Sequence, residues 1–371
     1  MKRRTQLASL LMAAALTLSL AACGNDSGST PPVDTTPSGG GTPASTAPTT
    51  GDEALTIDQV WPSGTTVTID VPAKAGGGTD LYTRYLTQAL GEVVPGVNFV
   101  VNNYDTTEVG REHAKNADPD GKTLVIHHGG WILEYLAGST NVNPKDDVKV
   151  AGILNLGGPQ AIIAKPNAPY KNFTELGEYI KEHPGEVVIG CSLGGASQGS
   201  IYKVIEGLGE GYSELVNWVQ CGSEADKLTQ TASGSIDIAN ASIPNAQSYE
   251  ADGKLTILGC AGPSVATLEN MSELVGLDLG DSFKTTAEQG IADAEWNSCY
   301  YVWAPAGTPD NICAAINSAI MKATEVQSFI DGNKQMATFV DAVDYDAAQQ
   351  TFADEWASMD EVATGMGIKT R

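Results

Sequence analysis

The sequence is poor in basic residues. Its 371 residues include 21 lysines and arginines against 45 aspartates and glutamates, which gives a formal net charge of -24. Proteins that bind nucleic acid need clustered cations to neutralise phosphates, so this balance excludes a nucleic-acid partner. An anionic small molecule would also be repelled, unless the local field of its site overrides the field of the whole chain. Helix N-termini supply such a field without lysine or arginine.

Histidine and paired cysteine are scarce as well. The chain has four histidines without H-E-x-x-H spacing and no C-x-x-C pair, so no metal site is predicted. Apart from Cys23 there are five cysteines, an odd number, so at least one thiol is free or paired between chains. Most of them lie in apolar, strand-like contexts, where buried and unreactive thiols are expected: Cys191, Cys221, Cys260, Cys299 and Cys313.

The common catalytic and nucleotide-binding motifs are missing or incomplete. Gly190 to Gly194 reads G-x-S-x-G, the motif of a hydrolase nucleophile elbow, but that fold needs its histidine after the serine. All four histidines precede Ser192: His113, His127, His128 and His183. No Gly-Lys-Ser/Thr follows the glycines at 76–78, and no G-x-G-x-x-G follows a predicted strand. The sequence therefore predicts neither a catalytic residue nor a cofactor.

Only the N-terminus carries a long apolar run. Three basic residues precede an apolar run from Leu7 to Leu20, a pattern typical of a secretory signal and too short for a spanning helix. The run ends in Leu-Ala-Ala-Cys-Gly, which resembles a bacterial lipobox and makes Cys23 the lipidated first residue after a signal peptide at 1–22. An ordinary signal peptide cleaved nearby is the alternative. Residues 23–52, nearly all Ser, Thr, Pro, Gly, Ala and Asn, are predicted to form a flexible linker.

The folded body is organised around the stretch from Val67 to Leu86. A run of β-branched residues predicts a buried strand that ends at Pro72, and three glycines at 76–78 follow it. Thr79 or Asp80 can cap the next helix. A strand, a glycine loop and a helix N-terminus leave free N–H groups for a small anion. Many α/β proteins carry a glycine-rich first turn that binds nothing, so this remains an alternative.

The same alternation continues along the chain. Gly129 and Gly130 separate a strand from a helix, and residues 191–200 form a third glycine-and-serine loop before a helix. This rhythm predicts an α/β fold with mostly parallel, doubly wound sheets. Such sheets bind ligands beyond the carboxyl ends of their strands, so the glycine loops are expected to face one cleft between two sheets. One of His127 and His128 is expected near that cleft and the other in the packing.

Several motifs in a fixed order resemble a known family, the substrate-binding proteins of tripartite tricarboxylate transporters (Bug or TctC). The resemblance covers nearly all of Gln59 to Ile368. It rests on Trp61-Pro62-Ser63, Pro72…Gly76-Gly77-Gly78-Thr79-Asp80, Asp118-Pro119-Asp120-Gly121-Lys122-Thr123-Leu124, Ser192…Gly194…Ser197-Gln198, Gly234-Ser235-Ile236-Asp237-Ile238, Gly253-Lys254-Leu255 and Ala304-Pro305-Ala306-Gly307-Thr308-Pro309.

The resemblance implies a two-lobed, Venus-flytrap fold of the periplasmic-binding-protein type that closes on a small carboxylate. We expect lobe 1 to comprise residues 53–156 and 259–371 and lobe 2 residues 157–258, with hinges near 154–158 and 255–259. The family holds its carboxylate largely through backbone N–H groups and water of two loops. The expected ligand-binding residues are Lys74, Ala75, Gly76, Gly77, Gly78, Thr79, Asp80, His128, Gly129, Ser192, Gly194, Ala196, Ser197, Gln198 and Tyr300.

The implied function is that of an extracytoplasmic, lipid-anchored receptor that delivers a di- or tricarboxylate, or a related acid, to the membrane subunits of a transporter. A sensor for a membrane signalling partner and a surface enzyme acting on a carboxylate are the alternatives. The chain departs from the family at Gly199, Cys221 and Cys299, which replace a histidine, a tyrosine and an aromatic residue. Lys74 also replaces a small residue or proline, and either reaches a second carboxylate or points to solvent.

Overall fold

The computed structural model describes residues 53–291 and 293–371, which belong to one compact unit. The predicted signal peptide, Cys23 and the predicted linker lie outside the described residues. Within the described part of the chain, no helix has both the length and the apolar character needed to cross a membrane.

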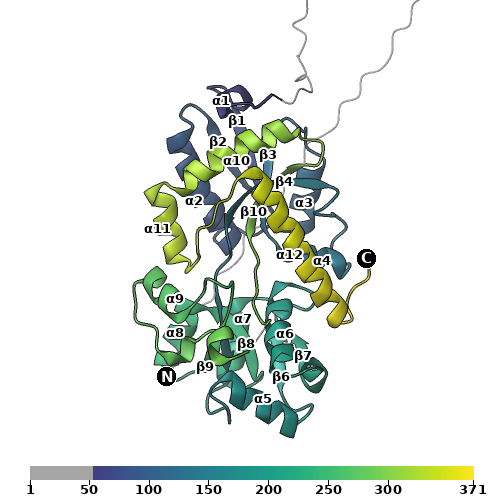
Figure 1. The fold of residues 1–371 in the computed structure, drawn as a ribbon, viewed down its shortest axis with the longest axis vertical. Helices are drawn as coiled ribbons and strands as arrows, with labels where there is room; N and C mark the ends of the chain where they lie inside the picture. Colours follow the sequence, from purple (N-terminus) through teal and green to yellow (C-terminus); the bar gives the residue numbers. More distant parts are fainter. Residues whose placement is uncertain (1–52, 292) are drawn as a thin grey trace, which may run out of the picture. The chain divides into compact units, whose positions relative to one another are not determined.

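Strands and helices alternate along most of the described chain, although two strands follow each other directly near its middle and three helices end it (Figure 1). The strands are β1 (Thr66–Val71), β2 (Asn98–Asn103), β3 (Thr123–His128), β4 (Val148–Asn155), β5 (Gln160–Ala164), β6 (Val188–Cys191), β7 (Asn217–Gln220), β8 (Ile238–Ser242), β9 (Thr256–Ala261) and β10 (Tyr300–Pro305). The α-helices are α1 (Ile57–Val60), α2 (Gly78–Val93), α3 (Thr107–Lys115), α4 (Gly130–Leu136), α5 (Phe173–Glu182), α6 (Ala196–Leu208), α7 (Glu224–Ser233), α8 (Ile243–Ala251), α9 (Leu268–Val275), α10 (Asp310–Thr324), α11 (Gln327–Gln335) and α12 (Tyr345–Gly365).

These strands form two five-stranded sheets. Sheet A has the order β2-β1-β3-β10-β4 and sheet B the order β7-β6-β8-β5-β9. Each sheet contains two parallel and two antiparallel neighbouring pairs, because β10 in sheet A and β5 in sheet B run against their neighbours. The prediction of mostly parallel sheets is therefore corrected to mixed sheets, although the α/β class and the presence of two sheets are confirmed.

The two reversed strands have one cause. β5 is the first strand after the chain crosses from sheet A, and β10 is the first strand after it crosses back, so both run away from the crossing. The other strands of each sheet run antiparallel to β5 or β10 and therefore end at the crossing. The carboxyl ends of eight strands meet there, which is where open α/β sheets bind ligands.

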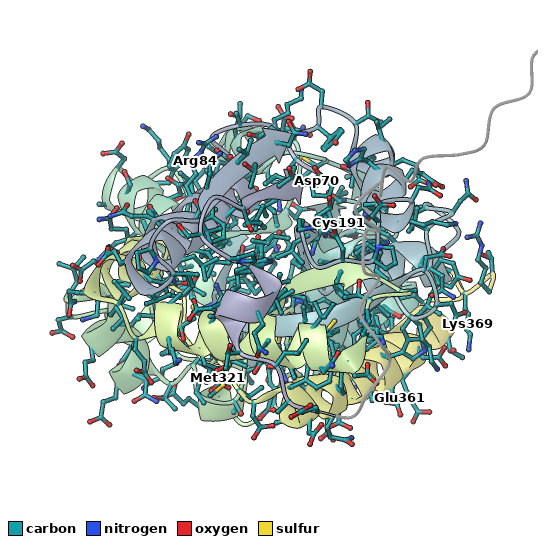
Figure 2. All side chains as sticks on the ribbon, turned by 90° about the horizontal axis from the view of Figure 1, so that it is seen from above. Asp70, Arg84, Cys191, Met321, Glu361 and Lys369 are labelled. Atoms are coloured by element: carbon teal, nitrogen blue, oxygen red, sulfur yellow. The ribbon has the colours of Figure 1, made fainter. Side chains whose placement is uncertain are left out.

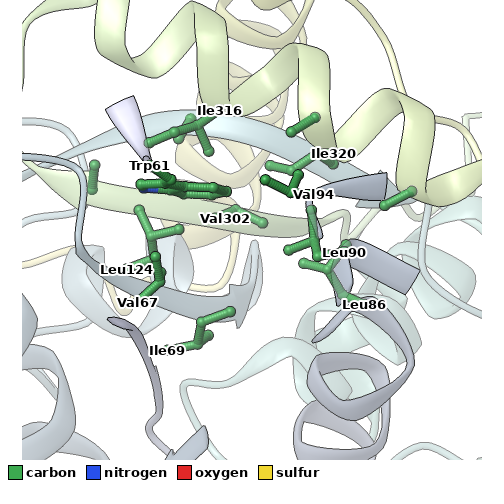
Figure 3. Packing of buried hydrophobic residues seen from close by; sticks show 14 of the residues in the cluster. Trp61, Val67, Ile69, Leu86, Leu90, Val94, Leu124, Val302, Ile316 and Ile320 are labelled. Atoms are coloured by element: carbon green, nitrogen blue, oxygen red, sulfur yellow. The ribbon is translucent and has the colours of Figure 1, made fainter. Parts of the chain in front are cut away.

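Helices cover both faces of each sheet, and apolar side chains fill the layers between them. One cluster joins sheet A to α2 and α10 and includes Trp61, Leu90, Val302 and Ile316 (Figure 3). A second cluster packs Trp131, Trp303 and Tyr301 against α12 on the opposite face. Sheet B has two clusters of the same kind, one under α5 and α6 and the other under α7 and α8. These layers hold the strand ends in fixed positions.

Three segments lie together at the crossing between the sheets. Residues 156–159 join β4 to β5, residues 295–299 precede β10, and residues 336–344 join α11 to α12. Gly157 has φ +77, and a Cβ built there would lie 2.7 Å from the carbonyl oxygen of Ser298. The N–H of Leu156 donates to the carbonyl of Phe339 at 3.1 Å. The second crossing thus lies at 295–299 rather than at the expected 255–259, which falls within sheet B.

The division into lobes stays a prediction, and its boundary at 258 falls inside β9. Elsewhere some elements differ from expectation. The helix expected after residue 200 begins at Ala196, and the short helices α1, α9 and α11 were not expected. The cap of α2 is Gly77 rather than Thr79 or Asp80.

Candidate functional site

A cavity of about 210 Å³ lies where the strand ends of both sheets meet. Sheet A, sheet B and both crossing segments contribute to its wall. The lining residues are His128, Leu156, Gly157, Gly158, Gln160, Ala196, Ser197, Ser200, Lys227, Asn240, Trp296, Ser298 and Tyr300. Four of the predicted ligand-binding residues, from three separate parts of the chain, are among them: His128, Ala196, Ser197 and Tyr300.

Sheet A contributes His128 and Tyr300, which lie opposite each other at the ends of neighbouring strands. The Gly130 N–H donates to His128 Nδ1 at 3.1 Å, so the proton of the neutral imidazole is on Nε2. Burial lowers the pKa of His128 and keeps the ring neutral. Burial also raises the pKa of Tyr300, whose ring lies 5.8 Å from that of His128. Both side chains are therefore neutral hydrogen-bond donors at neutral pH.

The other predicted histidine has a structural place. His127 is 4% exposed and its ring lies 5.9 Å from the ring of Trp131. Burial holds its pKa well below the ordinary value, so it is neutral. His128 thus lines the cavity, while His127 belongs to the packing.

Sheet B contributes the start of α6. Gly195 is the N-cap, and Ala196 and Ser197 are the first two helical residues. Their backbone N–H groups have no hydrogen-bond partner within the described residues. Free N–H groups of a helix N-terminus carry a partial positive charge and bind anions. Because both residues line the cavity, this wall is suited to an anionic group.

Lys227 adds a full positive charge that the sequence did not indicate. It is 7% exposed, and its Nζ donates to Asn240 Oδ1 at 2.5 Å. Asn240 comes from β8 and is itself 4% exposed. Gln160 begins β5, the reversed strand of sheet B, as Tyr300 begins β10 in sheet A. The cavity has no aspartate or glutamate in its lining, although acidic residues outnumber basic ones about two to one in the whole chain.

The first glycine loop lies behind Tyr300 and is absent from the cavity lining. A Cβ built at Gly78 would lie 3.6 Å from the Tyr300 hydroxyl oxygen, and the Thr79 side chain hydrogen-bonds to Tyr300. Lys74 is exposed in this structure and lines no wall of the cavity. The predicted roles of Lys74, Ala75, Gly76, Gly77, Gly78, Thr79 and Asp80 in ligand binding therefore stay predictions.

Asp80 holds this loop in place. Its carboxylate accepts hydrogen bonds from Gly76 N at 2.8 Å, Arg84 Nε at 2.9 Å and Asn103 Nδ2 at 3.0 Å. Burial opposes the charge, but these bonds hold the pKa of Asp80 below its ordinary value. Asp70, which is also buried, and Arg84 are labelled in the view from above (Figure 2). Asp80 is thus committed to the loop itself.

The serine-rich loop before α6 is bonded internally. Ser192 N donates to Ser197 Oγ at 2.8 Å, and Gly194 N donates to Gln198 Oε1 at 2.7 Å. Leu193 N donates to Gln220 Oε1 at 2.9 Å. These hydrogen bonds fix the loop. They use the backbone N–H groups of Ser192 and Gly194 and the side-chain oxygen of Gln198. Gly129, another predicted residue, is buried and donates its N–H to the Cys299 carbonyl.

The structure accounts for Gly199, one of the residues at which the chain departs from the family pattern. A Cβ built at Gly199 would lie 2.5 Å from the ring of Trp296, which lines the cavity. Gly199 therefore leaves room for the Trp296 ring beside the α6 N-terminus. The five cysteines in the described residues, including Cys221 and Cys299, are free and buried. No cluster of histidine, cysteine and acidic residues within the described residues could hold a metal ion.

Comparison with known proteins gives a consistent result. The family model described as "Tripartite tricarboxylate transporter family receptor" matches residues 96–362. A UPF0065 protein of Agrobacterium vitis, from the TAR-I ttuE-ttuC' intergenic region, is 23% identical over 276 residues, covering 73% of this chain and 75% of that protein.

Two solved structures resemble the described fold. A Rhodopseudomonas palustris protein with adipate has a TM-score of 0.66 at 23% identity, covering 83% of this chain and 99% of that one. MatC of the same organism, with bound malate, has a TM-score of 0.62 at 20% identity, covering 80% and 98%. At these identities the structures establish the fold.

Proposed function

Because the chain belongs to the tripartite tricarboxylate transporter receptor family, we propose that it binds a small organic carboxylate and delivers it to the membrane subunits of such a transporter. The ligand is a di- or tricarboxylate or a related acid. The relatives solved with malate and adipate support this ligand class. The protein acts outside the cytoplasm as a binding protein, without catalysis.

One observation carries the proposal. The cavity between the strand ends is lined by hydrogen-bond donors, by the α6 N-terminus and by one lysine, and by no acidic side chain. In a chain with a net charge of -24, such a lining provides the local field that an anion needs. We propose that Ala196 and Ser197 bind a carboxylate of the ligand through their N–H groups, with His128 and Tyr300 as donors from sheet A.

The proposed binding mode has a clean test at Ala196. Proline in its place removes the N–H, and proline is well tolerated at the first position of a helix. Gly195 before it has φ -113 and ψ 177, the extended conformation that a residue preceding proline prefers. Losing one hydrogen bond to a charged acceptor costs about 1.5–3 kcal/mol, so Ala196→Pro should bind carboxylates about 10- to 100-fold more weakly.

The matched control is Ala196→Gly, which keeps the N–H and should bind within a few-fold of the natural protein. Calorimetric titration with a panel of mono-, di- and tricarboxylates measures all three proteins. Equal affinities of Ala196→Pro and Ala196→Gly, with both folded, would exclude this binding mode. Binding of sugars or nucleotides with no response to any carboxylate would exclude the ligand class itself.

The first glycine loop joins the site in our proposal when the lobes close. The part of the chain that carries sheet A moves as one lobe toward the part that carries sheet B, which brings the loop at 75–80 to the ligand. Closure of this kind is common in two-lobed binding proteins. Small-angle scattering with and without the bound acid should show a smaller radius of gyration for the complex, and an unchanged radius would contradict closure.

The membrane anchor rests on the sequence alone. We propose that cleavage after Ala22 leaves Cys23 as a lipidated first residue, followed by the linker up to residue 52. Mass spectrometry of the processed protein should find lipid on Cys23, and Cys23→Ser should release the protein from the membrane fraction. An unmodified N-terminus at another residue would support the ordinary signal peptide instead.

A further inference from the structure

Lys227 is a buried cation without an ionic partner. It lies in the first half of α7, is 7% exposed and lines the cavity. Its ammonium group makes one hydrogen bond within the described residues, to Asn240, and forms no ion pair there. An ammonium has three donors, so two remain for another acceptor.

The acidic residue that acts most strongly on Lys227, Glu224, does not form an ion pair with it. Glu224, one turn earlier in α7, accepts three hydrogen bonds at Oε1, from Ser242 N at 2.8 Å, Ser242 Oγ at 2.6 Å and Asn245 Nδ2 at 3.0 Å. Burial lowers the pKa of Lys227, and the attraction of Glu224 only partly offsets this. Removing a cation from water without a paired anion is costly, so a bound anion would compensate for it.

The cavity therefore offers two separate attractions for negative charge. The first is the pair of free N–H groups at the start of α6, and the second is the ammonium of Lys227 at the junction of α7 and β8. They come from two different helices that pack against sheet B, and both line the same cavity. A ligand with one carboxylate satisfies one of them, whereas a ligand with two satisfies both.

We propose that Lys227 binds a second anionic group of the ligand and makes the protein selective for dianionic acids over monoanions of the same size. The proposal rests on the proposed function, since it assumes a carboxylate at the α6 N-terminus. It assigns the second carboxylate to Lys227 of α7, a helix that packs on sheet B, rather than to the exposed Lys74 of the first loop.

The test compares an acid with its own half-amide. Malonate, succinate, malate, glutarate and adipate are titrated into the purified protein, and the tightest binder is compared with its monoamide, which has nearly the same shape and one charge less. We expect the dianion to bind about 30-fold or more tightly than the monoamide, as for a desolvated charge pair. In Lys227→Met this ratio should fall to within a few-fold of one.

Two further lysine variants control for charge and for the rival residue. Lys181→Met removes an exposed lysine from α5 and should leave the ratio unchanged. Lys74→Met should also leave it unchanged, and loss of selectivity in Lys74→Met instead of Lys227→Met would overturn the proposal. Thermal unfolding without ligand shows whether Lys227→Met folds, and we expect it to melt at or above the temperature of the natural protein because an unpaired buried charge is gone.

The remaining outcomes separate the two proposals. If carboxylates bind but dianion and monoamide bind equally well, Lys227 does not hold a second anionic group, while the proposed function stands. If Lys227→Met weakens both ligands by the same factor, one carboxylate is shared between Lys227 and the α6 N-terminus, and selectivity for dianions is refuted. If no carboxylate binds, both proposals fail. A loss of the ratio confined to Lys227→Met supports the inference.

Discussion

The stability of the protein should depend on pH through one buried carboxyl group, Glu355 of α12. It is 5% exposed, its Oε2 accepts a hydrogen bond from the Tyr301 hydroxyl, and its Oε1 has no partner within the described residues. Burial raises the pKa of Glu355 from 4.5 to about 8, although bonds from Tyr301 and Cys299 work against the rise. The folded protein thus keeps a proton here that the unfolded chain has lost.

The difference in the pKa of Glu355 between the folded and the unfolded protein sets the sign and the size of the pH effect on stability. Between pH 4.5 and about 8 the unfolded chain binds fewer protons at this site than the folded protein, so stability falls as pH rises. At about 1.4 kcal/mol per pH unit, the loss between pH 5 and pH 8 is about 4 kcal/mol. Glu355→Gln has no proton to lose, so its stability should gain about 4 kcal/mol relative to the natural protein over the same range.

Urea unfolding of both proteins at several pH values measures the effect, because all other titrating groups are common to the two and cancel in the difference. Asp354→Asn is the matched control, since Asp354 is the exposed neighbour of Glu355 on the same helix. Its difference from the natural protein should stay constant over this range. Parallel stability curves for Glu355→Gln and the natural protein would refute the reasoning.

Two further predictions concern the loops near the cavity. Gly129→Ala should destabilise the protein by about 1–3 kcal/mol in the same urea assay, because a Cβ there would lie 1.8 Å from Glu355 Oε1. The double variant Gly129→Ala/Glu355→Ala should recover part of this stability. No recovery would rule out the clash as the cause. Asp80→Asn should speed amide hydrogen exchange at Gly76, because the Gly76 N–H donates a hydrogen bond to the Asp80 carboxylate. Unchanged exchange would show that another group holds the loop.

Much of the fold follows from local patterns in the sequence. β-branched runs gave the strands of both sheets, and glycine junctions marked where strands end and helices begin, because backbone freedom is needed there. The helix α9 was missed although Thr267 caps it and Gly276 ends it in the left-handed conformation. Its capping signals lie in a segment with weak apolar periodicity, and local signals alone do not separate such a helix from a loop.

The directions of β5 and β10 could not be predicted from the sequence. A strand's direction depends on the end of the sheet at which the chain enters after a crossing. This is a property of the tertiary fold rather than of β-propensity. The crossing at 295–299 was misplaced for the same reason, because the segment between β9 and β10 stays with sheet B before it returns.

Part of the candidate site could be predicted from the sequence. His128, Ala196, Ser197 and Tyr300 line the cavity because they stand at strand ends or at a helix start, positions that the alternation of elements locates. Lys227 was missed because α7 has few large apolar residues, so its inward face could not be identified, and charged side chains are mostly exposed. A lysine next to Leu228 on the buried side of the helix was the only signal.

The most direct test of the account is a crystal structure of the protein with the dicarboxylate that binds it best. We predict one carboxylate within hydrogen-bond distance of the Ala196 and Ser197 N–H groups and the other within hydrogen-bond distance of Lys227 Nζ. A ligand held by the loop at 74–78 alone, with the cavity between the strand ends left to water, would contradict the account.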